Sequence, residues 1–116
     1  MNDSQVEQEI QAKGLTAPRV TPADIEANIV EEVYFTASQG AIHAGYTMKF
    51  DSSLLLLTFC VLELRNGFTV TGESACASHE NFDAELGRKI ARQNAVNKVW
   101  PLMGYELKCR LAGGVA

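Results

Sequence analysis

The sequence predicts an α+β fold in which a small antiparallel sheet packs against a long helix. Two observations lead to this prediction. Two β-rich runs, residues 54–64 and 68–76, are joined by the turn residues Arg65-Asn66-Gly67, which is typical of a β-hairpin. A helical stretch then covers residues 81–100, and a shorter helix over residues 22–33 precedes the hairpin.

A chain of 116 residues is long enough for one domain with a single core. We expect this domain to span residues 21–111. Residues 1–20 are expected to form a peripheral or flexible N-terminal segment, and residues 112–116 a flexible tail.

The charge balance limits the kinds of partner that the protein can bind. The formal net charge is −4, which argues against binding through DNA phosphates or anionic lipids. The N-terminus lacks the basic and apolar regions of a signal peptide, and the longest purely apolar run, Leu54 to Leu57, is too short to span a membrane. We therefore expect no membrane association and a cytoplasmic location.

Cysteine and histidine usage gives no sign of a cofactor or metal site. Cys60, Cys76 and Cys109 are odd in number and lack CxxC spacing, which favours free thiols. His43 and His79 are too few for a dedicated zinc site. We expect no cofactor and no metal.

The helix predicted over residues 22–33 has a clear start. Thr21 can cap it, Pro22 suits the first turn, and Asp24 completes a capping pattern. Ile25, Ile29 and Val33 follow at intervals of four, which extends the pattern to Val33. Tyr34-Phe35-Thr36 fits either a last helical turn or a short strand.

Residues 37–53 contain three turn-like clusters around a short alternation of apolar and polar residues. The alternation at 46–50 predicts a strand, and the whole segment is the expected place for a mobile or functional loop.

The hairpin register follows from its apolar pattern. A three-residue loop with Gly67 in the left-handed conformation sets Leu64 opposite Phe68 and Leu62 opposite Val70. One face then holds Leu56, Cys60, Leu62, Leu64, Phe68, Val70 and Cys76, and the other holds Glu63, Arg65, Thr69, Thr71 and Glu73.

The helix predicted over residues 81–100 carries two apolar stripes and should end before Pro101. The first stripe is Phe82, Leu86, Ile90, Val96 and Trp100, and the second is Ala84, Ala91, Ala95 and Val99. Two stripes indicate contact on both sides, by the sheet and by another helix or a second subunit, so we expect a homo-oligomer. A turn at Met103-Gly104 and an edge strand over residues 105–111 should follow.

The stretch "GESACASHENFD" (residues 72–83) resembles a catalytic cluster, but its spacing argues against one. A nucleophile elbow needs glycine on both sides of the serine, and Cys76 stands where the second glycine should be. We predict that Ser74 continues a strand and that Ser78, Asn81 and Asp83 cap helix ends. Cys76 with His79 could form a thiolate pair, although an inward-facing thiol is the preferred interpretation. We expect no catalytic residues and no enzymatic activity.

The basic residues concentrate at Arg88, Lys89 and Arg92, on the predicted long helix. Arg88 and Arg92 are neighbours on the helix surface, so with Lys89 they could bind a phosphate or an acidic patch on a partner. The alternative is a solvated helix face on which Glu85 pairs with Arg88 or Lys89. The sequence leaves both interpretations open. Trp100 and Tyr105 are expected as core anchors.

The run from Leu64 to Leu107 resembles a family of small tailed-phage and prophage proteins, known from coliphage N-four and a Shigella phage. The resemblance rests on Asn66-Gly67-Phe68, Gly72-Glu73-Ser74, Asn81-Phe82-Asp83, Gly87, Ala91, Ala95, Trp100 and Gly104-Tyr105. Upstream, "PRVTPADIEANI" and Tyr34-Phe35 also fit, so the resemblance covers about residues 18–111.

The resemblance implies a phage or prophage origin, a bacterial cytoplasmic setting and no established activity. Small phage proteins often bind and disable a host protein. The resemblance therefore suggests a non-enzymatic protein that binds a host macromolecule, as an inhibitor used in host takeover or counter-defence. The alternative is a binder of a nucleotide or short nucleic acid through the basic face at Arg88, Lys89 and Arg92.

Overall fold

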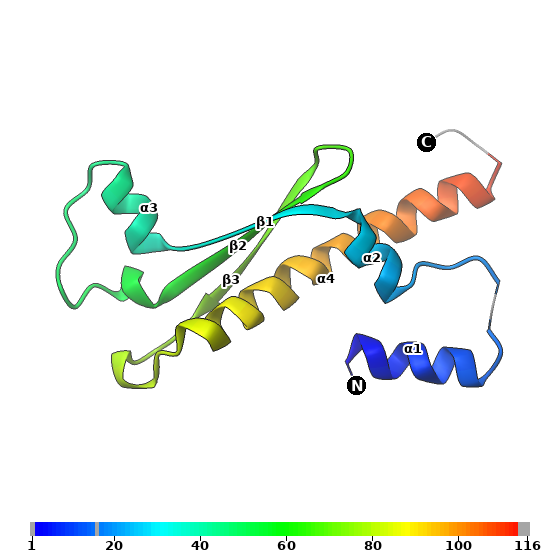
Figure 1. Ribbon diagram of the computed structural model, residues 1–116. Coiled ribbons are helices and arrows are strands. Elements are labelled where there is room, and N and C mark those ends of the chain that lie inside the picture. The colour runs from blue at the N-terminus through cyan, green and yellow to red at the C-terminus, as the bar shows by residue number, and fades with distance from the viewer. Residues whose placement is uncertain (1, 16, 114–116) are drawn as a thin grey trace. The chain divides into compact units, whose positions relative to one another are not determined.

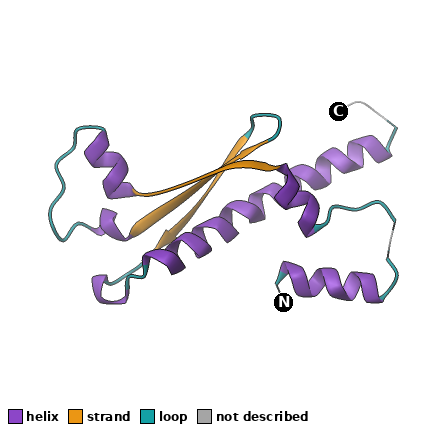
Figure 2. Cartoon of the chain, in the orientation of Figure 1, coloured by secondary structure: helices purple, strands orange, loops and turns teal. Residues whose placement is uncertain are grey.

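The computed structural model describes residues 2–15 and 17–113 and confirms the α+β class (Figures 1 and 2). The helices are α1 (Asp3–Ala12), α2 (Pro22–Asn28), α3 (Ala37–His43) and α4 (Ala84–Leu111). The strands are β1 (Ile29–Thr36), β2 (Leu57–Leu64) and β3 (Thr69–Ala75), in the sheet order β1-β2-β3. Two short 3-10 helices lie at Ser53–Leu56 and His79–Asn81.

The chain divides into two compact units. One contains the residues up to Asn28 together with those from Val99 onward, and the other is Ile29–Lys98. Helix α4 contributes to both, because its residues 84–98 fall in the second unit and its residues 99–111 in the first.

The predicted hairpin register is confirmed. Leu62 lies opposite Val70, and the Leu64 N–H donates to the Phe68 carbonyl oxygen at 2.8 Å. Gly67 adopts a φ of 87°, a left-handed conformation that suits glycine, and its N–H donates to the Leu64 carbonyl oxygen at 2.9 Å. Phe68, predicted to face inward, is 55% exposed because it belongs to the turn and β3 begins only at Thr69.

The core of the unit Ile29–Lys98 lies between the sheet and the first four turns of α4 (Figure 1). Buried side chains of the sheet are Thr58, Cys60, Leu62, Leu64 and Val70, and those of α4 are Ala91, Ala95 and Val96. Ala91 and Ala95 of the small-residue stripe therefore face the sheet, whereas Ala84 of that stripe is exposed and Val96 of the larger stripe is buried. Leu86 and Ile90 of the larger stripe are exposed, and the second subunit expected on that side stays a prediction.

The helix predicted over residues 22–33 is too long, because α2 ends at Asn28 and Ile29–Thr36 forms the edge strand β1. The segment that the four-residue spacing assigned to the helix is also rich in β-branched and aromatic residues, which favour strands. This segment pairs antiparallel with β2, with Val33 opposite Val61 and Phe35 opposite Phe59. The pairing provides hydrogen-bond partners for the backbone of the segment and therefore favours strand over helix.

Residues 37–53 differ from the prediction in two ways. Helix α3 forms where turns were expected, because Thr36 and Gln39 make a capping box. No strand forms at residues 46–50. Ser52 caps the 3-10 helix Ser53–Leu56, so the first hairpin strand begins at Leu57 rather than at residue 54.

Helix α4 begins and ends later than predicted. Asp83 caps its start by accepting a hydrogen bond from the Leu86 N–H at 3.0 Å. The helix then passes through Pro101, so the turn at Met103-Gly104 and the strand at residues 105–111 are wrong. Pro101 cannot donate to the carbonyl of Asn97, an exposed residue. Good helix formers after Pro101, and the Glu106–Arg110 ion pair, support the continuation.

The other unit contains α1, α2 and the last turns of α4. Asn2 and Gln5 form a capping box at the start of α1. Arg19 donates to both carboxylate oxygens of Glu7, at 2.7 Å for the Nη2–Oε2 contact. The half-buried Trp100 donates its indole N–H to Asp3 Oδ2 at 3.2 Å, whereas Tyr105, predicted as a core anchor, is 71% exposed. Of the predicted tail, residues 114–116 lie outside the described residues.

Candidate functional site

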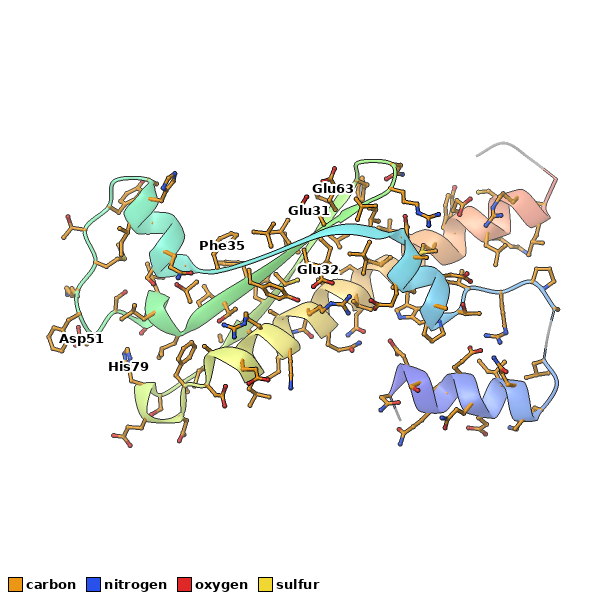
Figure 3. All side chains as sticks on the ribbon, in the orientation of Figure 1. Glu31, Glu32, Phe35, Asp51, Glu63 and His79 are labelled. Carbon is orange, nitrogen blue, oxygen red and sulfur yellow. The ribbon has the colours of Figure 1, made fainter. Side chains whose placement is uncertain are left out.

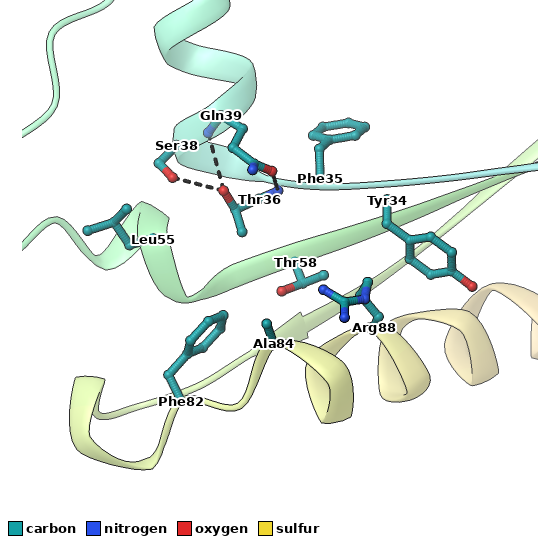
Figure 4. Close-up of a pocket in the computed structure, with 10 residues that line it drawn as sticks. All are labelled: Tyr34, Phe35, Thr36, Ser38, Gln39, Leu55, Thr58, Phe82, Ala84 and Arg88. Carbon is teal, nitrogen blue, oxygen red and sulfur yellow. Dashed lines mark hydrogen bonds between the residues drawn. The ribbon is translucent and has the colours of Figure 1, made fainter.

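A pocket of about 420 Å³ lies in the unit Ile29–Lys98, where the end of β1, the start of α3, β2 and the start of α4 meet (Figure 4). Its size falls in the range of small-molecule sites. Arg88 is the one charged side chain among its lining residues, which are Tyr34, Phe35, Thr36, Ser38, Gln39, Leu55, Thr58, Phe82, Ala84 and Arg88.

The polar wall of the pocket is fixed by the capping box of α3. Thr36 Oγ1 accepts from the Gln39 N–H at 3.2 Å, and Gln39 Oε1 accepts from the Thr36 N–H at 2.8 Å. The hydroxyls of Thr36 and Ser38 lie 2.8 Å apart, and Ser38 is buried. These groups are held in place before any ligand arrives, which lowers the ordering cost of binding.

The aromatic walls come from segments far apart in the sequence. Phe82 precedes α4 and directs its ring into the pocket, and Tyr34 of β1 lies on the opposite side near Arg88 (Figure 4). Tyr34 also donates its hydroxyl to Glu32 Oε2 at 2.9 Å, so the ring is oriented by a hydrogen bond.

The three predicted basic residues have different surroundings. Lys89 pairs with Glu85 at 3.4 Å on the exposed side of α4. Arg92 donates to Glu32 Oε1 from Nε at 2.9 Å and from Nη2 at 2.7 Å. Arg88 lines the pocket, and no residue in the described part of the chain forms a hydrogen bond or ion pair with it. The structure therefore brings only Arg88 to the pocket as a cation available to a ligand.

Electrostatics beside the pocket follow from the ion pair between Glu32 of β1, labelled in Figure 3, and Arg92 of α4. The Arg92 hydrogen bonds hold the pKa of the Glu32 carboxyl below its usual range. Burial, followed by the hydrogen bond to Glu32, raises the pKa of the Tyr34 phenol, so this ring stays neutral. Burial also raises the pKa of the Cys60 thiol and makes it a poor nucleophile.

The stretch from Gly72 to Asp83 forms the end of β3, a 3-10 helix and the cap of α4. Ser74 lies in β3, as predicted. The half-buried Cys76 thiol donates to the Ser78 carbonyl oxygen at 3.2 Å, and His79 Nε2 lies 3.0 Å from the Asp51 carbonyl oxygen (Figure 3). Cys76 and His79 thus have separate backbone partners.

Sequence reasoning missed most of the pocket. Tyr34, Thr36, Ser38, Thr58 and Phe82 were not singled out as site residues. The pattern Thr36-x-x-Gln39 was the available signal, because it marks a helix start that places Ser38 and Gln39 beside β2. The approach of Phe82 to this wall depends on the path between β3 and α4, which no local pattern encodes.

Two features are absent from the described residues. No group of three or more histidine, cysteine, aspartate or glutamate side chains could hold a metal ion there. Within residues 2–15 and 17–113, none of the helices combines the length and the apolar character needed to cross a membrane.

Comparison with known proteins supports the resemblance seen in the sequence. The model of the phage protein (N4 Gp49/phage Sf6 gene 66) family matches residues 20–111. No curated protein and no solved structure matches the chain. The family match covers both strands of the hairpin, the pocket and all of α4. The chain therefore belongs to the phage protein (N4 Gp49/phage Sf6 gene 66) family.

Proposed function

We propose that this phage protein is a non-enzymatic binding protein that takes up a small anionic molecule of nucleotide type in the pocket beside Arg88. The observation that carries the proposal is an unpaired guanidinium at the wall of a pocket of about 420 Å³. No carboxylate lines the pocket to neutralise it.

The lining chemistry fits both halves of a nucleotide. A guanidinium offers two parallel N–H donors to phosphate oxygens. The rings of Phe82 and Tyr34 offer flat apolar surfaces on which a base can stack. The hydroxyls of Thr36, Ser38 and Thr58 can bond to a sugar or to the base edges.

Native mass spectrometry of protein purified gently from a bacterial host tests for a retained ligand. We expect masses that exceed the bare protomers by a few hundred daltons each. Titration calorimetry with the four ribonucleoside monophosphates then tests the class directly. Bare protomers together with no heat from any monophosphate would contradict the proposal.

Arg88→Glu and Lys89→Glu form a matched pair of variants. Both reverse one charge on adjacent positions of α4, but only Arg88 lines the pocket. We expect Arg88→Glu to weaken binding at least tenfold, since it removes a charged hydrogen bond, and Lys89→Glu to leave it unchanged. Equal effects would show that the pocket is not the site. Arg92 is a poor probe of binding, because its replacement would also remove the ion-pair partner of the Glu32 carboxylate.

Binding of a host macromolecule is the second candidate function. One observation favours it: the face of the sheet directed away from α4 presents apolar side chains, among them Val33 at 44% exposure. Retention of one host protein from bacterial lysate on the immobilised chain, and not on an unrelated acidic protein, is the expected result. Failure to retain any would remove this candidate.

A further inference from the structure

The face of the sheet directed away from α4, here called the outer face, has a mixed character. It consists of the side chains that alternate with the buried ones along each strand. These are Glu31, Val33, Phe35, Leu57, Phe59, Val61, Glu63, Thr69, Thr71, Glu73 and Ala75.

An apolar strip runs along the middle of the outer face. Val33 lies opposite Val61 and Phe35 opposite Phe59, and the two phenylalanine rings have centroids 5.6 Å apart. Within the unit Ile29–Lys98, α3 lies at the Phe35 end of the strip, where a Cβ at Gly40 would be 3.6 Å from that ring. The Val33 end is open to solvent.

Every charged strand residue on the outer face is acidic, because Arg65, predicted on this face, belongs to the turn after β2. The three strands contain no lysine or arginine, and no described residue forms an ion pair with Glu31, Glu63 or Glu73. Glu31 lies directly opposite Glu63, as Figure 3 shows near the hairpin turn. Like charges in this position destabilise a sheet, so the pair has a cost that packing within the unit does not explain.

We infer that the outer face docks a cationic, amphipathic segment of another protein, an inference that rests on the second candidate function. Apolar side chains of that segment would cover Val33 and Val61, and its lysines or arginines would pair with Glu31, Glu63 and Glu73. A second copy meeting the same face would bring three glutamates against three. Nucleic acid and anionic lipid would be repelled in the same way.

The test uses two synthetic 18-residue amphipathic helical peptides with the same leucine positions, one with lysine and one with glutamate on the polar face. Fluorescence anisotropy with the full chain should show binding of the lysine peptide only, weakening as salt rises. The variant E31Q/E63Q/E73Q should bind at least tenfold more weakly. The control E9Q/E80Q/E85Q makes the same charge change at exposed acids elsewhere and should bind like the unmodified chain.

Amide NMR shifts locate the peptide, and changes should centre on Val33 and Val61. Equal binding by the two triple variants, or shifts confined to α1 or α4, would overturn the inference. So would a self-association of the chain, seen in sedimentation, that E31Q/E63Q/E73Q strengthens, because the face would then accept a second copy. A host protein retained equally by the chain and by this variant would keep the second candidate function and overturn only the surface.

Discussion

Gly72 on β3 faces the backbone of Ala91 on α4 so closely that a methyl group at position 72 would lie 2.1 Å from the Ala91 carbonyl oxygen. It would also lie 2.3 Å from the backbone nitrogen of Ala95. Backbone atoms of a helix cannot move aside individually, so the sheet and α4 approach each other at this point only because position 72 has no side chain.

Gly72→Ala should therefore lower the free energy of unfolding by about 3 kcal/mol, the upper end of the usual cost of overpacking a tight core. Gly104→Ala is the matched control, because a Cβ there meets nothing within 4 Å and the site is helical. That control should raise stability by up to about 1 kcal/mol. Urea denaturation of both variants measures the difference, and equal stabilities would show that α4 does not pack this closely.

The Glu32–Arg92 pair predicts a pH-dependent contribution to stability. The pKa of Glu32 is lowered in the folded state, so the contribution is complete above the unfolded-state pKa of about 4.3 and is lost as pH falls through the folded-state pKa. Glu32→Gln should cost up to about 1 kcal/mol at neutral pH, since the pair is partly exposed.

Denaturation of the unmodified chain and Glu32→Gln between pH 7 and pH 3 measures this loss, with the difference shrinking towards acid pH. Glu85→Gln, which removes a solvent-exposed pair with Lys89, should show little difference in stability across this pH range. A difference for Glu32→Gln that stays constant down to pH 3 would contradict the assignment.

Glu31 and Glu63 should repel each other across β1 and β2. Either Glu31→Gln or Glu63→Gln should raise stability by a few tenths of a kcal/mol, and the double variant should gain little more because one repulsion is relieved in both. Glu73→Gln serves as the control, since Glu73 lies opposite Phe59. Thermal denaturation at low salt measures the effect, and additive gains would argue against direct repulsion.

The Glu7–Arg19 interaction should hold α1 against the chain segment before α2. Hydrogen bonds from Arg19 and Gln11 lower the pKa of Glu7 to about 2. The stabilisation is therefore complete above about pH 4.3 and is lost as pH falls towards 2. Carboxyl NMR titration should give this midpoint for Glu7, and Arg19→Ala should return it towards the usual value.

Hydrogen exchange of the amides in α1 should accelerate in Arg19→Ala, because α1 has no buried residue of its own to hold it. The exposed pair Lys13–Glu9 supplies the comparison, since Lys13→Ala should leave exchange nearly unchanged. An ordinary Glu7 titration in the unmodified chain would show that the ion pair does not form.

Local chemistry explains what the sequence predicted well. Gly67 restricts the hairpin to one loop type, and the apolar alternation of β2 and β3 then selects one register. The same logic failed at Ile29–Thr36, where helical spacing and strand composition coincide and only pairing with β2 decides between them. At Pro101 the prediction failed for the opposite reason. Proline is a strong local signal for the end of a helix, but good helix formers on both sides continue the helix through it.

The candidate site was only partly predictable. The pattern of basic residues pointed to Arg88, Lys89 and Arg92, but their different partners depend on where β1 lies. Glu32 was placed on a helix in the prediction, so its pairing with Arg92 could not be foreseen. The pocket gathers residues from two strands, β1 and β2, and from helices and a loop, and sequence spacing does not encode tertiary contacts of this kind.

The close approach at Gly72 has a consequence for how relatives of this chain can vary. A side chain at position 72 is compatible with the fold only if α4 moves outward, and that movement would leave the methyl groups of Ala91 and Ala95 without their contacts. Larger residues at positions 91 and 95 would then be needed to refill the space. Positions 72, 91 and 95 should therefore change together in an alignment, and redesign of this core must treat the three as a single choice.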